Sequence, residues 1–339
     1  MAYSSGTASS MNDLMSQLST FCQANGWTQD QYTAESGGTH GKLSLHKGTV
    51  YVHFQWNSSI AASIAMYQSL GFISSGTNIW AHTDDSGNGP STVPIATWDN
   101  PTYTGRYRLI SEIGAGPYTS HAFFQGNGVE DYVHVVLEFA PYIYRHFGFG
   151  ILEKSWDWTG GEYAYAHCQT YTPDNYFQDI LLPSQGVASS TYANRFATVH
   201  AEGLPGEPVN SKWGTFAKFS ALNSSWSDRA GEYQIRFLGG SPGGFIGNHF
   251  INMPSNAGDG FLPLNANAIF YRDLSPTPDN LYFMGFQPDV RSLNMKSFSP
   301  KDEVSVAGDT WVIFPAVRKQ NTGDKNESEN WGIAYKKIT

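Results

Sequence analysis

The sequence predicts a mainly β protein, built as an antiparallel β-sandwich or barrel-like sheets with long loops and a short N-terminal helix. From residue 107 onward, short segments alternate apolar and polar side chains, and this two-residue period is that of a strand. Turn-forming residues recur between them, with 35 Gly and 17 Pro in 339 residues. Repeated short strands with such turns are typical of sandwiches and barrels rather than βαβ units.

Residues 10–25 carry the clearest helical pattern in the chain. Ser10 can cap the helix, Asp13 suits its positive first turn, and Gly26 can end it. The apolar residues recur at helical spacing and predict one buried stripe: Met11, Leu14, Leu18 and Phe21 or Cys22. A second, shorter helix is expected over Ile60–Leu70, where Ile60, Ile64, Tyr67 and Leu70 have similar spacing.

Residues 42–56 read as a hairpin that turns at Lys47-Gly48. One face is apolar and consists of Leu43, Leu45, Val50, Val52, Phe54 and Trp56. Further strands are expected at Tyr107–Ile113, Thr119–Phe124, Asp131–Phe139, Phe196–Ala201, Trp213–Phe219, Tyr233–Leu238, Leu281–Phe286, Glu303–Val306, Thr310–Val317 and Trp331–Tyr335.

Pro and Gly residues predict where these strands are interrupted. A turn is expected at Pro288-Asp289, and Pro315 predicts an edge strand or a bulge, because proline cannot donate a ladder hydrogen bond. Long surface loops are expected at residues 239–244, 256–260 and 274–278. Pro-rich connectors after residue 172 predict an N-terminal helix-plus-β region, 1–172, and a C-terminal β region, 173–339, with a single domain as the alternative.

The composition favours a protein whose surface is covered by partners. Only 14% of the residues are charged and 15% are aromatic, and apolar surface on that scale usually marks contacts. The net charge of −9 argues against nucleic acid, which is bound mainly through Lys and Arg. Cys22 and Cys168 lack metal spacing and fit a reducing compartment. Neither a signal peptide nor a membrane span is expected.

Phe147–Cys168 joins two aromatic segments through a corner near the middle of the chain. Glycines at 148, 150, 160 and 161 would let strands turn and approach closely. Trp156 and Trp158 flank Asp157, and with nearby Tyr163 they are candidates for an interface or a glycan platform. Packing between strands or subunits is the competing interpretation.

Catalytic and metal motifs are weak. A glycosidase would need two carboxylates about 5–10 Å apart, and the acids near the corner are Asp131, Glu138, Glu153, Asp157 and Glu162. His134 and His167 are acid–base candidates, His46 and His53 a possible metal pair, and residues 84–90 a faint calcium-loop pattern. No nucleophile elbow or phosphate loop occurs, so we expect no enzyme, no cofactor and no metal.

Three segments are similar to one kind of protein. They are Ala2–Ala8 with Asp13–Met15 and Phe21–Trp27; His146–Lys154 with Trp158–Gly161; and Pro288–Arg291 with Asp309–Pro315 and Asn330–Tyr335. They resemble virion structural proteins of tailed bacteriophages, in which a Gly-Thr-Ala leader precedes a short helix that ends in Asn-Gly-Trp.

The resemblance implies a component of the tail, the tail tip or baseplate, or the neck, built as a symmetric homo-oligomer. It assigns no catalytic residues. The expected partners are copies of the chain and neighbouring tail, baseplate or neck proteins, without direct nucleic-acid or membrane contact, in a virion assembled in the host cytoplasm. The alternative is a glycan-binding or glycan-cleaving receptor protein of the tail, and a free cytoplasmic enzyme is a weaker third.

Overall fold

The computed structural model describes residues 2–58, 63–75, 107–110, 113–126, 131–166, 197–202, 213–215, 232–237, 264–273, 280–316 and 331–338. These residues form three antiparallel sheets and one α-helix. The predicted β-rich fold with a short N-terminal helix is therefore confirmed. The described strands close no barrel.

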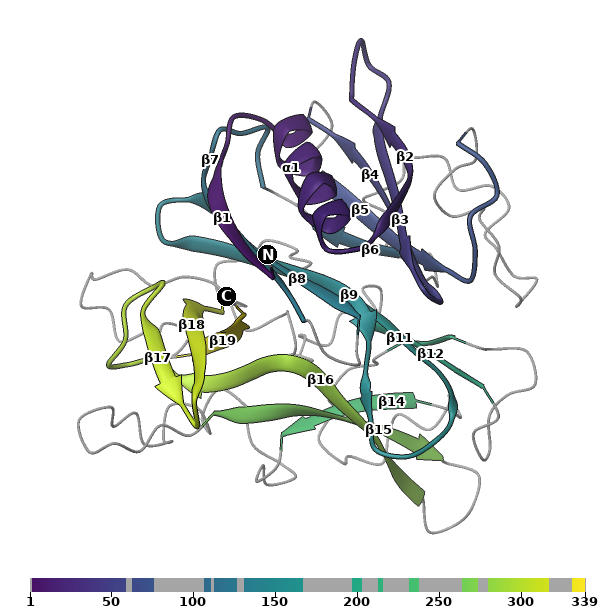
Figure 1. Cartoon of the computed structure of the whole chain (residues 1–339), viewed down its shortest axis with the longest axis vertical. Coiled ribbons are helices and arrows are strands. Elements are labelled where there is room, and N and C mark those ends of the chain that lie inside the picture. The colour runs from purple at the N-terminus through teal and green to yellow at the C-terminus, as the bar shows by residue number, and fades with distance from the viewer. Residues whose placement is uncertain are drawn as a thin grey trace, which may run out of the picture.

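The central sheet separates the other two layers (Figure 1). In sheet order its strands are β1 (Tyr3–Ala8), β7 (Tyr118–Gln125), β8 (Tyr132–Ala140), β9 (Ile143–Ile151), β11 (Thr159–Ala166), β12 (Ala197–Glu202) and β13 (Trp213–Thr215). Strands β12 and β13 follow residue 172 in the chain, so the expected domain boundary falls between two neighbouring strands of this sheet, β11 and β12.

The two outer sheets contain the remaining strands. The N-terminal sheet runs β2 (Thr28–Thr33), β3 (Gly41–Lys47), β4 (Val50–Asn57), β5 (Ser63–Ser69) and β6 (Tyr107–Ile110). The C-terminal sheet runs β14 (Glu232–Phe237), β15 (Asn265–Asp273), β16 (Asn280–Asn294), β19 (Trp331–Lys337), β18 (Asp309–Pro315) and β17 (Glu303–Val306). The two-residue strand β10 (Glu153–Lys154) pairs with β16.

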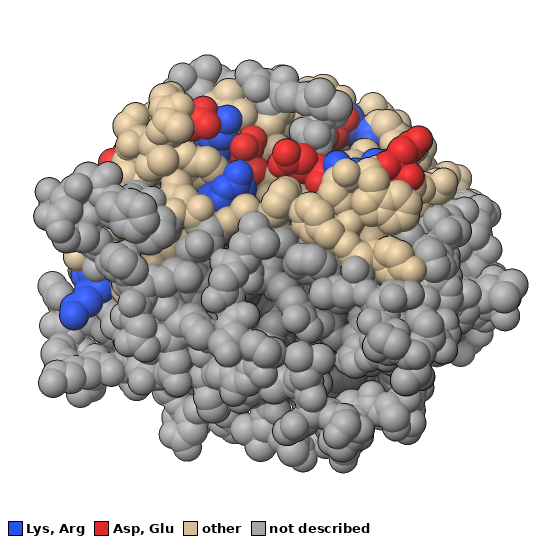
Figure 2. Space-filling view, turned by 90° about the horizontal axis from the view of Figure 1, so that it is seen from below, with Lys and Arg blue, Asp and Glu red and all other residues tan. Residues whose placement is uncertain are grey.

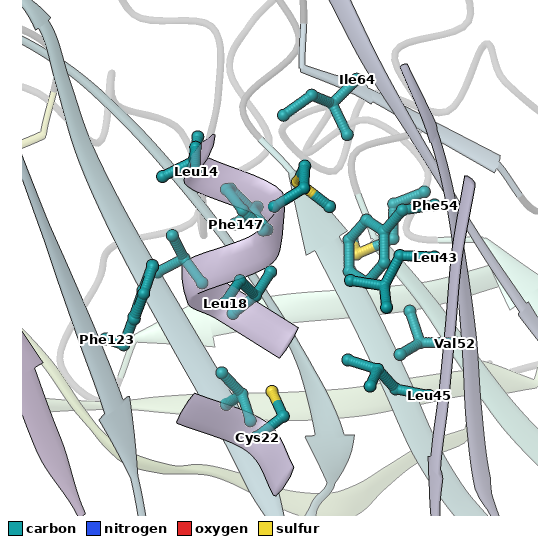
Figure 3. Close-up of a cluster of buried hydrophobic side chains, with 14 of the residues drawn as sticks. Leu14, Leu18, Cys22, Leu43, Leu45, Val52, Phe54, Ile64, Phe123 and Phe147 are labelled. Atoms are coloured by element: carbon teal, nitrogen blue, oxygen red, sulfur yellow. The ribbon is translucent and has the colours of Figure 1, made fainter. Parts of the chain in front are cut away.

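Helix α1 (Met11–Ala24) packs between the central and N-terminal sheets, as Figure 3 shows. Its predicted start is confirmed, because the Ser10 hydroxyl accepts a hydrogen bond of 3.2 Å from the Asp13 backbone N–H. The predicted stripe is buried together with the apolar face of the β3–β4 hairpin. Leu14, Leu18 and Cys22 of the helix thus share one core with residues of both sheets.

The central sheet is buried on both faces. Along β8, Val133, Val135 and Leu137 belong to the core shared with the helix and the N-terminal sheet. Tyr132 and Val136, on the other face, belong to the core shared with the C-terminal sheet. The polar half of the alternation in this strand therefore faces a second protein layer rather than water, and its hydrogen bonds must be made inside the protein.

Two local predictions are wrong. Ile60–Leu70 is not a helix, because its described part, 63–70, contains β5, which pairs along β4 and places Ile64 and Met66 in the core. The helical spacing was coincidental, since every second residue was also suitable for a strand. Pro288-Asp289 is not a turn between strands but lies inside β16.

Strand β16 bulges at this point. Residues 287–290 lie between the β15 pairings of Ala268 with Phe286 and Ala266 with Arg291. Asp289 has a φ of 51°, a left-handed conformation that such bulges use. Pro315 is the last residue of β18 and pairs with Gly332 of β19 without a register shift, so there is no bulge. The pairing of β18 with β17 covers only Asp309–Val312, so no described strand pairs with Pro315 on its other side and the predicted edge is found locally. The expected loops at 239–244, 256–260 and 274–278 lie outside the described residues.

Candidate functional site

The corner between β9 and β11 fastens the central sheet to the C-terminal sheet. The Trp156 indole N–H donates to the Phe283 carbonyl oxygen at 2.9 Å, and the Trp158 N–H donates to that of Met284 at 3.3 Å. The Ser155 backbone N–H donates to the same Met284 carbonyl. The two indoles therefore donate hydrogen bonds to consecutive residues of β16, Phe283 and Met284.

The three aromatic candidates do not form one exposed surface. Trp156 is 40% exposed, whereas Trp158 is 6% and Tyr163 only 1% exposed. Trp158 and Tyr163 belong to the core between the central and C-terminal sheets. A glycan or protein partner can reach only Trp156 of the three, because the other two rings are covered by the chain itself.

Two of the candidate acids are too far apart to act on one bond. Glu138 pairs across from Tyr144 and Glu162 across from Ile151, so they lie at opposite ends of β9. Seven residues of extended strand span ~23 Å, well beyond the ~5–10 Å of a glycosidase pair. Glu138 and Glu162 therefore cannot form that pair.

Glu138 is a structural anchor between layers. Its carboxylate accepts hydrogen bonds from the Ser120 hydroxyl at 2.7 Å, the Lys301 ammonium at 2.9 Å and the Tyr142 backbone N–H at 3.1 Å. Burial raises the pKa of this carboxyl, but Lys301, Ser120 and Tyr142 together outweigh burial and hold its pKa below the usual value. The ionised form is thus stabilised in the folded protein.

Replacing Glu138 by Gln should lower the free energy of unfolding by about 1–3 kcal/mol at pH 7, because charge-assisted hydrogen bonds to a buried group are lost. The depressed pKa contributes stability above the unfolded-state value that is lost as the pH falls through the folded value. Urea unfolding should therefore show the two proteins converging in acid. The control is Glu303→Gln, which removes the more exposed Lys337 ion pair and should cost under about 1 kcal/mol; an equal cost would contradict the assignment.

A second pair of acids lies at the other end of the central sheet. His200 Nδ1 is 2.7 Å from the Glu162 carboxylate, and the Asp131 carboxylate is 2.7 Å from the Lys47 ammonium. Burial raises the pKa of Glu162, but its hydrogen bonds to His200 and Thr49 outweigh burial and lower it. Glu162 is therefore held ionised, whereas a general acid must keep its proton near neutral pH.

The metal candidates are not brought together. His46 Nδ1 is 2.8 Å from Asp30, while His53 is buried between the Ser44 and Ser69 hydroxyls. In the part of the chain that the structure describes, no three His, Cys, Asp or Glu side chains are grouped as a metal would need. The 84–90 loop, His167 and Cys168 lie outside the described residues.

Two buried histidines and two buried tyrosines form a polar cluster, of which sequence patterns indicated only His134. We name it the His–Tyr cluster: His134, His146, Tyr165 and Tyr335. His134 Nδ1 is 2.8 Å from the Tyr165 hydroxyl, and its Nε2 is 2.9 Å from the Pro288 carbonyl oxygen. His146 repeats this arrangement, at 2.8 Å to the Tyr335 hydroxyl and 2.9 Å to the Pro315 carbonyl oxygen.

The cluster joins the central sheet to the C-terminal sheet. His134 and His146 lie on the central sheet, whereas Pro288, Pro315 and Tyr335 lie on the C-terminal sheet, so three of the four hydrogen bonds cross between the sheets. Burial is the main cause that lowers the pKa of His134 to about 4 and that of His146 to about 3. Both imidazoles are therefore neutral near pH 7. Strand alternation could have placed these side chains on one face, but not opposite their partners, which lie 31 to 189 residues away in the chain.

Charges on the described surface are mixed. Figure 2 shows Lys and Arg beside Asp and Glu rather than in separate patches on the face it views. Lys336 lies 3.0 Å from Asp309, and Lys337 lies 2.7 Å from Glu303. The described basic residues near the C-terminus are thus engaged by acids, an arrangement unlike the basic stripe typical of nucleic-acid binding.

Comparisons with known proteins identify no relative. No protein-family model matches the chain, and no curated protein matches it. Among the described residues, the single helix is too short and too polar to cross a membrane. The geometry defines a layered, β-rich protein whose central and C-terminal sheets are joined by Trp156, Trp158 and the His–Tyr cluster.

Proposed function

We propose that the chain is a structural protein of a tailed-phage virion, which assembles as a symmetric homo-oligomer in the tail, the baseplate or the neck. Its work is shape and adhesion rather than chemistry. Copies of the chain and neighbouring virion proteins are its partners, and assembly takes place in the host cytoplasm.

The observation that carries this proposal is the meeting point of the segments that resemble virion proteins. His146 belongs to the central segment, while Pro288, Pro315 and Tyr335 belong to the C-terminal one. They supply two members of the His–Tyr cluster, His146 and Tyr335, and the two carbonyl oxygens to which its imidazoles bond. Two of the three resembling regions thus meet where the layers are joined, as expected of a rigid building block, although His134 and Tyr165 lie outside them.

The surface supports the same proposal. Ile73, Tyr142 and Trp156 are large apolar residues that are 58%, 55% and 40% exposed. Tyr142 lies in the turn before β9 and Trp156 in the corner after it, at opposite ends of the strand. A protein with few charges and exposed aromatic rings at two ends can contact neighbours on both sides.

The test is the mass of the purified protein and its location. Light scattering should give a multiple of the 37.3 kDa chain, and mass spectrometry should find the protein in purified particles. A stable monomer that is absent from particles would refute the proposal. The same protein in particles but monomeric in solution would retain the virion role and refute self-assembly before incorporation.

Replacing Trp156 by Ala should weaken assembly while leaving a folded protein. The ring is 40% exposed, so losing its buried part and one hydrogen bond should cost only about 1–2 kcal/mol. Sedimentation would measure the loss of oligomer. The variant Tyr142→Ala, at the opposite end of β9, tests whether one end of the strand or both contribute to the oligomer interface. Unchanged sedimentation of both variants would exclude the two rings from that interface.

The Trp156→Ala variant also distinguishes the structural role from the alternative, a glycan-binding or glycan-cleaving receptor protein. The exposure of the Trp156 ring favours this alternative, because an exposed aromatic ring can stack on a sugar. Binding to host-surface polysaccharide that is lost in Trp156→Ala, with the oligomer unchanged, would favour the receptor. If the unmodified protein neither binds nor shortens the polysaccharide, the receptor alternative is excluded.

A further inference from the structure

Strand β1 leaves one edge of the central sheet open. It is the first strand in the order of that sheet, and among the described strands it pairs with β7 alone. Its residues Ser5, Gly6 and Thr7 are exposed. At the end of the strand the Gln17 side chain donates to the Thr7 carbonyl oxygen at 3.0 Å. The stretch before Thr7 is therefore accessible to another chain.

The register of β1 shows which of its backbone groups point outward. The Gln125 backbone N–H donates to the Ala2 carbonyl oxygen at 2.8 Å, so these opposite residues form a hydrogen-bonded pair. Bonded and non-bonded pairs alternate along antiparallel strands. Ser4 therefore bonds to β7, whereas Tyr3 and Ser5 direct their N–H and C=O groups away from it. No described residue bonds to these four outward groups.

The four outward groups match an extended backbone. They are two donors and two acceptors at two-residue spacing, which is the pattern that an edge strand offers to an added strand. A second β1 strand that runs antiparallel presents the same four groups. With Ser4 opposite Ser4 of the second copy, Tyr3 of each copy lies opposite Ser5 of the other. Every outward N–H of Tyr3 and Ser5 then donates to an outward C=O.

The distribution of charge also favours a second copy at this edge. The chain has a net charge of −9, so two copies repel each other least where acids are absent. Strand β1 contains no charged residue and no proline. By contrast, the edge strand β2 contains Asp30 and a bulge, and the edge strand β17 has four residues and begins with Glu303. Charges, bulges and short length are features that oppose strand addition.

We propose that the β1 edge binds the β1 strand of a second copy, antiparallel and about a two-fold axis beside Ser4, so that two central sheets join into one. This inference rests on the self-assembly in the proposed function and names a surface that performs it. The small residues Ser4, Ser5 and Gly6 let the two strands approach to the ~5 Å spacing of a sheet. Trp156 and Tyr142 flank β9, three strands from this edge, and stay available for other contacts.

The decisive variant is Ser5→Pro. It removes an outward N–H that makes no bond to β7, and proline is tolerated in an edge strand where the N–H faces solvent. The urea-unfolding midpoint should stay nearly unchanged, whereas sedimentation over a range of protein concentrations should show self-association weakened at least about tenfold. Ser5→Thr is the matched control, because it keeps the N–H and suits a strand. It should associate like the unmodified protein.

A disulfide tests the register. In the Ser4→Cys variant the two new thiols face each other in a non-hydrogen-bonded pair, with Cα atoms ~4.5 Å apart, within the range that a disulfide spans. Mild oxidation should therefore give a covalent dimer on a non-reducing gel. Adding Ser5→Pro should abolish this dimer, and the unmodified protein controls for Cys22 and Cys168. If Ser5→Pro does not fold, the Ser4→Cys disulfide decides alone.

The outcomes separate this inference from the proposed function. An oligomer that Ser5→Pro does not weaken and that Ser4→Cys does not crosslink would overturn the inference and leave the proposed function standing. A monomer at every concentration would also overturn it, while mass spectrometry of particles decides the virion role separately. If Ser5→Pro still self-associates but no longer enters particles, the edge binds another virion protein, which overturns the assignment to a second copy.

Discussion

Replacing Gly160 by Ala should lower the free energy of unfolding by more than about 3 kcal/mol, or prevent folding. Gly160 has a φ of 109°, which L side chains rarely adopt. A Cβ at this position would overlap the backbone carbonyl oxygen of His200 on the neighbouring strand β12. Backbone strain costs about 1–3 kcal/mol, and the clash adds to it because neither strand can move without breaking the sheet. Urea unfolding or loss of soluble protein would measure the effect.

The next residue provides the control. Gly161 has nearly the same φ, 110°, but its added Cβ would meet only side chains: the flexible Lys154 at 3.3 Å and Ile151 at 3.6 Å, an ordinary contact distance. Gly161→Ala should therefore show the strain alone, about 1–3 kcal/mol. Equal losses at the two positions would mean that strand approach plays no part. A larger loss at Gly160 would show that the corner needs glycine there for close packing of β11 against β12.

Acid should destabilise the protein strongly between pH 6.5 and pH 4. Burial lowers the pKa of His134 to about 4 and of His146 to about 3, below the ordinary value near 6.5 of an unfolded chain. The unfolded state therefore binds more protons in this interval, and stability falls with falling pH. Each imidazole contributes up to about 1.4 kcal/mol per pH unit, so the two together should remove on the order of 5 kcal/mol by pH 4.

Urea unfolding at several pH values would measure this dependence. A double variant, His134→Gln with His146→Gln, should be less stable at pH 7 but should lose less stability in acid. His46→Gln is the control, because His46 lies near the surface beside Asp30 and takes no part in the cluster. An equal acid dependence in the double variant and the unmodified protein would place the acid-sensitive groups elsewhere, for instance at His121, whose pKa burial lowers to about 4.

Short-range patterns in the sequence predicted much of the local structure. Helix α1 and the β3–β4 hairpin were predicted because capping, turn and periodicity signals lie within a few residues of one another. Strand β17 was predicted with its observed ends. Strands β1 and β15 were missed, because β1 is a polar edge strand and β15 lacks a clear alternation. The predicted helix at residues 60–70 was wrong because pairing with β4 decided the outcome.

The candidate site could be predicted only in part. Trp156, Trp158 and Tyr163 were singled out by residue type, but their exposure depends on which layer covers each ring. His134 was noted as a possible acid–base group, whereas its partners Tyr165 and Pro288 were not. The carbonyl of Pro288 reaches His134 only because β16 bulges inside the sheet, and the sequence indicated a turn there.

The sequence by itself determined the β-rich class, the one amphipathic helix and the low charge that motivates an assembly role. These properties are local or compositional, and they need no knowledge of distant partners. Only the tertiary structure decided that the central sheet is covered on both faces and that two histidines meet two tyrosines between the layers. The physical reason is that burial and hydrogen-bond partners come from residues far apart in the chain, which strand periodicity orients but does not pair.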